Sequence, residues 1–111
     1  MEVLNHNQTW IDTTGTYKVG TIQATRNQLE KAFGTAISYV PEEGNKVTTE
    51  WELRIKTVNG EFVASIHDWK RAEPSGRDQS ISWTVAGKEY EVNELVHQAF
   101  RKAHNLALQY A

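Results

Sequence analysis

Residues 47–69 read VTTEWELRIKTVNGEFVASIHDW, and this stretch decides the fold. Its first half alternates apolar residues with charged or polar ones, which is the period of a strand with one buried and one solvated face. The pair Asn59-Gly60 follows, and this pair is favoured in two-residue type I′ turns because both positions need a positive φ. The stretch therefore predicts an antiparallel β-hairpin.

A loop of Asn59 and Gly60 also predicts the pairing across the hairpin. Trp51 then lies across from Asp68 on the apolar face, and Glu52 lies across from His67 on the polar face. A slip of one residue would pair core residues with solvent residues, so we expect a well-specified register. Asp68 becomes a carboxylate on the core side, which needs partners because an unpaired buried charge is costly.

Further elements precede the hairpin. Alternation predicts a strand over residues 16–24, and a brief strand is expected within residues 36–40. Between them, Thr25 and Gln28 form a capping-box pattern for a short helix, and Gly34 supplies its C-terminal stop.

Residues after the hairpin predict one more strand and one more helix. A polar connection over 70–79 leads to a strand over 80–85, and apolar residues at helical spacing predict a helix over 92–110. Residues 41–45 are predicted to form a loop. This order indicates an α+β fold: an antiparallel sheet of three to five strands, with a short N-terminal helix and a long C-terminal helix packed on one face.

We expect a single domain over residues 16–111, preceded by an arm over residues 1–15. The arm is polar and lacks sustained periodicity, so it is either flexible or a short added strand. Trp10 within it could instead dock onto another subunit.

Composition excludes several classes of protein. The 111 residues include no cysteine, which excludes a disulfide scaffold, Cys-ligated zinc, an iron–sulfur cluster and thiol catalysis. The formal charge of −2 argues against bulk nucleic-acid binding. No apolar run is long enough to span a membrane, and no signal-peptide pattern is present, so we expect an intracellular protein.

The tryptophans and histidines divide by position. Trp51 and Trp83 lie on apolar faces and are predicted core residues, whereas Trp69, like Trp10, lies at an element end that a partner could reach. His97 and His104 are seven residues apart on the last helix, too far to share a metal, and are expected to be solvated or bonded to carbonyls. Motifs such as G-x-G-x-x-G, the P-loop, H-E-x-x-H and G-x-S-x-G are absent. We expect no cofactor and no metal.

The densest candidate cluster is His67-Asp68-Trp69-Lys70, where the second hairpin strand ends. Asp68 either caps nearby backbone N–H groups or contacts a ligand. The predicted Glu52–His67 pair is either an exposed ion pair or an acid–base dyad, which needs a pocket. Basic residues nearby and on the last helix could bind phosphate or form an ordinary solvated face. They are Lys70, Arg71, Arg77, Arg101, Lys102 and His104.

Four stretches carry a resemblance by their order and spacing: TIQATRNQLEKAFG, KVTTEW, NGEFVASIHDWK and ISWTVAG. Over residues 19–100 the chain resembles a family of small proteins encoded by bacteriophages. The family has no settled biochemical activity, so the resemblance implies a phage setting and no mechanism. His67 stands where a tyrosine is usual, and residues 84–87 depart from the family's turn, so no binding role is carried over to that turn.

A phage setting implies counter-defence, which is an associational argument because a fold does not determine a function. We expect a non-enzymatic binding protein of the host bacterial cytoplasm that sequesters a nucleotide-type immune signal or blocks a host defence protein. Sequestration implies a homo-oligomer. The expected ligand-binding residues are Phe33, His67, Asp68, Trp69, Lys70, Arg71 and Arg101.

Two alternatives stay open at this point. One is a nucleotide-processing enzyme that uses His67 and Asp68. The other is a structural or regulatory phage interaction protein without a small ligand.

Overall fold

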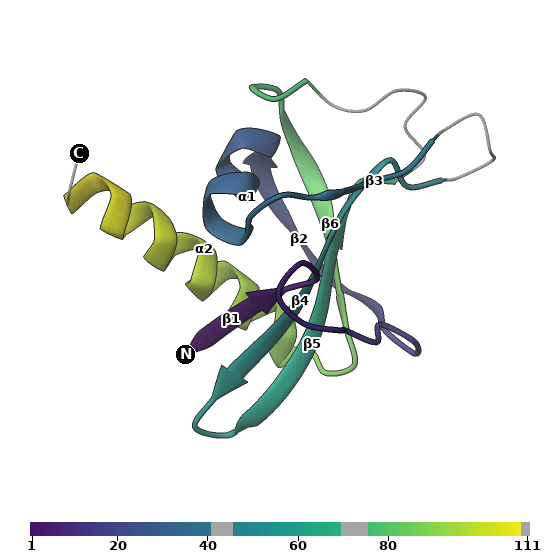
Figure 1. The fold of residues 1–111 in the computed structure, drawn as a ribbon, viewed down its shortest axis with the longest axis vertical. Helices are drawn as coiled ribbons and strands as arrows, with labels where there is room; N and C mark the ends of the chain where they lie inside the picture. Colours follow the sequence, from purple (N-terminus) through teal and green to yellow (C-terminus); the bar gives the residue numbers. More distant parts are fainter. Residues whose placement is uncertain (41–45, 70–75, 110–111) are drawn as a thin grey trace.

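An antiparallel sheet of six strands organises the chain, and both helices lie on the same side of it (Figure 1). The computed structural model describes residues 1–40, 46–69 and 76–109, and of residues 106–109 only the helical backbone. The elements are β1 (Glu2–Asn5), β2 (Tyr17–Thr25), α1 (Arg26–Phe33), β3 (Ile37–Ser38), β4 (Thr49–Thr57), β5 (Gly60–His67), β6 (Ser80–Gly87) and α2 (Glu91–Gln109). The predicted α+β class is confirmed.

The strands run in the order β1-β4-β5-β6-β2, and β3 also pairs with β4. The predicted meander of three consecutive strands is therefore present as β4, β5 and β6. The sheet exceeds the expected three to five strands because β1 and β3 are short and share one edge of β4, with Val3 opposite Ile55 and Ile37 opposite Glu50. Between these two short strands, the backbone N–H of Glu52 donates to His6 Nδ1 at 3.3 Å.

The register of the hairpin differs from the predicted one by two residues. Thr57 pairs with Gly60, so Val58 and Asn59 form the loop in place of Asn59 and Gly60. The Thr57 hydroxyl stabilises this loop by accepting from the Asn59 N–H at 3.0 Å and donating to the Gly60 carbonyl at 3.3 Å. Gly60 supplies the positive φ, 132°, and Val58 is fully exposed.

This shift changes the partners across the hairpin and leaves each residue on its expected face. Trp51 lies opposite Ile66, and not opposite Asp68 as predicted. His67 lies opposite Glu50, which corrects the predicted Glu52–His67 pair. A shift of two residues preserves the face because side chains alternate with a period of two.

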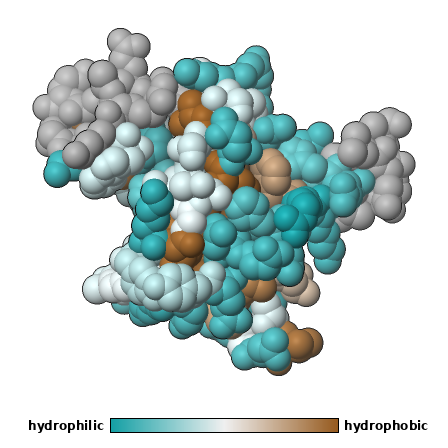
Figure 2. Space-filling model, turned by 180° about the vertical axis from the view of Figure 1, so that it is seen from behind, coloured by the Kyte–Doolittle hydropathy of each residue, from teal (hydrophilic) through white to brown (hydrophobic). Residues whose placement is uncertain are grey.

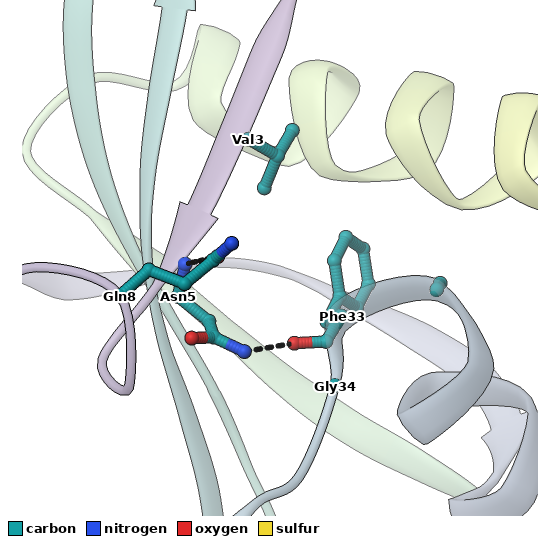
Figure 3. Close-up of a pocket in the computed structure, with 6 residues that line it drawn as sticks. Val3, Asn5, Gln8, Phe33 and Gly34 are labelled. Carbon is teal, nitrogen blue, oxygen red and sulfur yellow. Dashed lines mark hydrogen bonds between the residues drawn. The ribbon is translucent and has the colours of Figure 1, made fainter.

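The short helix α1 begins and ends as the sequence predicts. Thr25 and Gln28 form a reciprocal capping box, with N···O distances of 2.9 and 3.1 Å. Gly34 ends the helix with φ at 86°, a conformation that favours glycine. A side chain at this position would overlap the Asn5 amide, which donates to the Phe33 carbonyl (Figure 3). The end of α1 is thus attached to β1.

The hydrophobic core fills the space between the sheet and the two helices. Trp51 and Trp83 are both 0% exposed, and their rings meet edge to face with centroids 5.4 Å apart. Their indole N–H groups donate to the carbonyls of Gly34 at 2.7 Å and of Ala24 at 2.9 Å. Both tryptophans are the core residues that their apolar faces predict.

The long helix α2 is also held by its two histidines. His97 Nε2 is 2.8 Å from the Thr21 carbonyl on β2, and His104 Nε2 is 3.2 Å from the Gln28 carbonyl on α1. The expectation that these histidines bond to carbonyls is confirmed. Of the helices in the described part of the chain, none has the length and apolar composition of a membrane span.

Within residues 1–15, which we expect to form a flexible arm or a short added strand, Glu2–Asn5 form the strand β1. After β1 the chain crosses the sheet face that carries no helix, which we call the open face. There the Trp10 carbonyl accepts from Arg54 at 2.7 Å, and the Thr13 hydroxyl donates to Glu52 at 3.1 Å. Ile11 between them is 7% exposed. This segment therefore contacts β4 on the open face.

Candidate functional site

A hollow of about 480 Å³ lies on the open face across β5, β6 and β2, and we call it the groove. Its lining residues are Thr16, Tyr17, Lys18, His67, Trp69, Thr84 and Ala86. Predicted site residues His67 and Trp69 are therefore brought together in one cavity. Seen from behind, the molecule presents mostly hydrophilic residues, and its apolar residues form small separate patches (Figure 2). The hollow is of the size that small-molecule sites have in proteins.

Strand order and side-chain size create the groove. The middle strand β6 contributes the small side chains of Thr84 and Ala86. His67 on β5 pairs with Thr84, and Lys18 on β2 pairs with Ala86, so larger side chains stand on either side. A β-bulge follows Lys18 in β2, and a bulge bends a strand and re-aims its side chains.

A chain of hydrogen bonds leads from His67 across the open face. His67 Nδ1 is 2.9 Å from the Ser65 hydroxyl, and that hydroxyl donates to Glu50 Oε2 at 2.7 Å. The Tyr39 hydroxyl donates to the other carboxylate oxygen, Glu50 Oε1, at 2.6 Å. Ser65 is 2% exposed, so this chain is largely shielded from water. We call these four residues the polar chain.

The surroundings shift the pKa of both ends of the polar chain. Burial lowers the pKa of His67, and the carboxylates of Glu50 and Asp68 oppose that shift. Burial, together with the hydrogen bond to Glu50, raises the pKa of Tyr39. Both shifts favour the neutral forms, an imidazole at one end and a phenol donor at the other.

Trp69 forms the end of the groove beside His67. Its ring is 51% exposed and meets the His67 ring edge to face, with centroids 6.5 Å apart. The Lys46 ammonium lies 5.7 Å from the centre of the indole, within the range of a cation–π contact. The groove therefore has Lys46 near the end that Trp69 forms, in addition to Lys18 in its lining.

Asp68 lies on the opposite side of the strand from His67 and is 1% exposed. Its carboxylate accepts from the backbone N–H groups of Thr48 at 2.8 Å and Thr49 at 3.0 Å, and from the Thr48 hydroxyl. These hydrogen bonds pair the backbone N–H groups where β4 begins. The capping interpretation describes this geometry, with the difference that the capped residues belong to the neighbouring strand and not to the loop after Asp68.

The other predicted ligand-binding residues are not gathered around the groove. Phe33 is 4% exposed and packs between the helices and β1, where it lines two smaller hollows of about 270 and 190 Å³ (Figure 3). Arg101 lies on α2 and pairs with Glu94 at 3.1 Å. Lys70 and Arg71 lie outside the described residues.

Sequence reasoning missed five of the seven residues that line the groove and most of the polar chain. The sequence predicts no more than a strand for Tyr17 and Lys18, because the pairing of β2 with β6 is a contact between distant parts of the sequence. One signal was available, since Ser65, His67 and Trp69 alternate on the polar side of β5. A hairpin register shifted by two residues would have added Glu50 to them.

The described residues contain no group of three or more metal-ligating side chains. Comparison with known proteins finds no matching family model, no matching curated protein and no matching solved structure. The site is therefore interpreted from its own geometry.

Proposed function

We propose that this protein binds a nucleotide-type small molecule in the groove and acts by holding it. One observation carries the proposal: the groove places two aromatic rings, Tyr17 and Trp69, around the same hollow as a lysine, Lys18. In the phage setting implied by the resemblance, the ligand is an immune signal and the protein acts in counter-defence. The comparisons do not bear on that setting.

The chemistry of the lining matches the parts of a nucleotide. Aromatic side chains stack on bases with little dependence on sequence, and the indole of Trp69 is half exposed. The ammonium of Lys18 is a point charge suited to phosphate. The hydroxyls of Thr16 and Thr84 can donate to or accept from a ribose.

Binding fits the geometry better than the enzymatic alternative does. Successive residues of a strand point to opposite faces, and His67 and Asp68 follow this rule. The Asp68 carboxylate is occupied by Thr48 and Thr49 in the interior. His67 and Asp68 therefore do not face the same cavity, which argues against an enzyme that uses both.

Calorimetric titration of the purified protein with mononucleotides, cyclic nucleotides and ADP-ribose tests the proposal. Trp69→Ala is expected to weaken binding by about tenfold or more, because stacking on one aromatic ring contributes roughly 1–3 kcal/mol. Lys18→Gln should weaken the binding of phosphorylated ligands and leave the nucleosides unchanged. Native mass spectrometry of the same samples reports whether the ligand sits on one copy or on a homo-oligomer, as sequestration implies.

Matched controls separate the groove from the rest of the surface. Trp10→Ala removes another exposed tryptophan, and Lys31→Gln removes a lysine on α1; neither residue lines the groove. Both variants should bind as the unmodified protein does. The proposal is wrong if no nucleotide binds, or if the controls weaken binding as much as the groove variants do.

One observation favours the second version, in which the protein blocks a host defence protein. Trp10 is 77% exposed while its backbone is held by Arg54, so a large apolar side chain is presented on a fixed support. This version predicts that Trp10→Ala abolishes co-purification with a defence protein of the host. Trp69→Ala would leave the complex intact.

A further inference from the structure

The polar chain leaves one ring nitrogen available to the groove. His67 Nδ1 is engaged with Ser65, and within the described part of the chain His67 Nε2 has no hydrogen-bond partner. The His67 ring lines the groove. Nε2 is thus the nitrogen that a ligand would meet.

The directions of the hydrogen bonds determine the chemical character of Nε2. A carboxylate can only accept hydrogen bonds, so the Ser65 hydroxyl must donate its single proton to Glu50. The Ser65 oxygen then accepts from His67, which places the imidazole proton on Nδ1. In a neutral imidazole with the proton on Nδ1, Nε2 carries a lone pair and is an acceptor.

We propose that the polar chain fixes His67 as a hydrogen-bond acceptor, so that the groove selects nucleobases that turn an N–H donor towards Nε2, such as the exocyclic amino group of adenine or cytosine. This inference rests on the proposed function, because it names the ligand class of the same groove. A base edge without a donor leaves Nε2 desolvated and unpaired, which is costly inside a site. Discrimination built on a missing partner is stronger than discrimination by shape alone.

Tyr39 and Glu50 act as positioning residues in this arrangement. Tyr39 occupies one carboxylate oxygen and leaves the other for Ser65, so the carboxylate faces the serine. Glu50 lies directly across from His67 in the hairpin, and Ser65 is two residues before His67 on the same face. The acceptor is therefore held by β4 and β5, two neighbouring strands of the sheet.

The selection depends on pH because protonation of His67 converts the acceptor into a donor. The charged groups around it are the carboxylates of Glu50 and Asp68 and the ammonium groups of Lys18 and Lys46. Burial lowers the pKa of His67, so the neutral acceptor persists to a lower pH than it would on an exposed histidine. The preference for amino-bearing bases should therefore hold at neutral pH and disappear on acidification.

Two measurements test the inference independently. Long-range ¹⁵N–¹H correlation spectra of the free protein report which nitrogen of His67 carries the proton, and we expect Nδ1. Titration with adenosine 5′-monophosphate and with purine riboside 5′-monophosphate, which lacks only the amino group, should show about tenfold tighter binding of the former.

Variants identify the cause of the preference. Ser65→Ala should remove the hydrogen bond that fixes the tautomer of His67, and the affinities for the two nucleotides should become equal. His67→Phe should remove the preference while keeping an aromatic ring in the groove. Ser82→Ala is the matched control, because Ser82 is an exposed serine of β6 outside the groove and the polar chain. It should keep both the tautomer and the preference.

Each outcome is decisive. A proton on Nε2 in the free protein overturns the fixed acceptor. Equal affinities for the two nucleotides with the proton on Nδ1 overturn the selection while the proposed function stands. If neither mononucleotide binds while a cyclic nucleotide or ADP-ribose does, the selection fails and the proposed function stands. If no nucleotide binds, both fail, and the spectrum alone then decides whether His67 is fixed.

Discussion

The two faces of the sheet are built from the same strands and are held by different forces. On the covered face, β4, β5 and β6 supply Trp51, Ile66 and Trp83, all 0% exposed and packed against the helices. On the open face, the same strands supply Glu50, Ser65 and His67 to the polar chain and Thr84 and Ala86 to the groove. Apolar packing depends on buried area and tolerates changes of partner, whereas hydrogen bonds need particular partners at particular distances.

This difference predicts that substitutions on the two faces act on different properties. Removing a packed side chain leaves a cavity and lowers the free energy of unfolding. Removing a half-exposed side chain from the groove leaves the fold intact and changes what the groove binds.

The largest effect is expected from a matched pair of tryptophan substitutions. Trp83→Ala should lower the free energy of unfolding by about 3–5 kcal/mol, because a large buried side chain is lost from the core. It also leaves the Ala24 carbonyl without its indole donor. Trp69→Ala should change it by less than about 1 kcal/mol, since that ring is 51% exposed. Urea denaturation followed by circular dichroism measures both.

This pair gives a direct way to break the comparison. Equal destabilisation by the two variants would show that the open face contributes to stability as the covered face does. A nucleotide titration of Trp69→Ala completes the test, because its loss of binding should occur in a protein that is still folded.

The same comparison explains which parts of the molecule the sequence could predict. Alternation alone identified Trp51, Leu53 and Ile55 as core residues, and this prediction holds although the hairpin register is shifted by two residues. Each residue stays on its face when the shift is even, so the core does not depend on the exact register. The capping box at Thr25 was equally predictable because its two partners are three residues apart.

The open face needs the exact register and contacts between distant residues. Placing Glu52 across from His67 hid the bond from Ser65 to Glu50, which follows only from the observed pairing. Lys18 reaches the groove because β2 pairs with β6, which lies more than sixty residues further along the chain. Local patterns carry no information about such pairings, which is why the site was predicted only in part.

The second effect in size concerns Asp68, a polar residue at the margin of the covered face. Asp68→Ala should lower the free energy of unfolding by about 2–3 kcal/mol, because the N–H groups of Thr48 and Thr49 would be left buried without an acceptor. Asp68→Asn keeps one acceptor oxygen and should cost roughly half of that. Denaturant titration at neutral pH measures both variants.

Asp78→Ala is the control for the loss of a carboxylate. Asp78 is exposed and accepts one bond from the Asn27 amide at 2.7 Å, so its removal should change the free energy of unfolding by less than about 0.5 kcal/mol. If Asp68→Ala lowered the free energy of unfolding by no more than Asp78→Ala does, the capping role of Asp68 would be contradicted.

The smallest effect sharpens the comparison on the open face, and it concerns the pH dependence of stability. Burial lowers the pKa of His67, so the unfolded chain takes up the proton at a higher pH than the folded protein does. Below the ordinary histidine pKa, near 6.5, the unfolded state therefore binds more protons. The stability supplied by neutral His67 is complete above that pH and is lost as the pH falls through the folded pKa.

The loss should be less than about 1 kcal/mol between about pH 7 and about pH 5.5, because one pKa unit corresponds to roughly 1.4 kcal/mol and the ring is partly exposed. The difference between the unmodified protein and His67→Gln isolates it, since every other group is the same in both proteins. Unfolding in urea at the two pH values gives this difference. If His67→Gln lost more stability on acidification than the unmodified protein, the charged imidazole would be shown to stabilise the open face. The Ser65 oxygen accepts from Nδ1 in either protonation state, so the direction of the pH effect reports on burial of the ring and not on this bond.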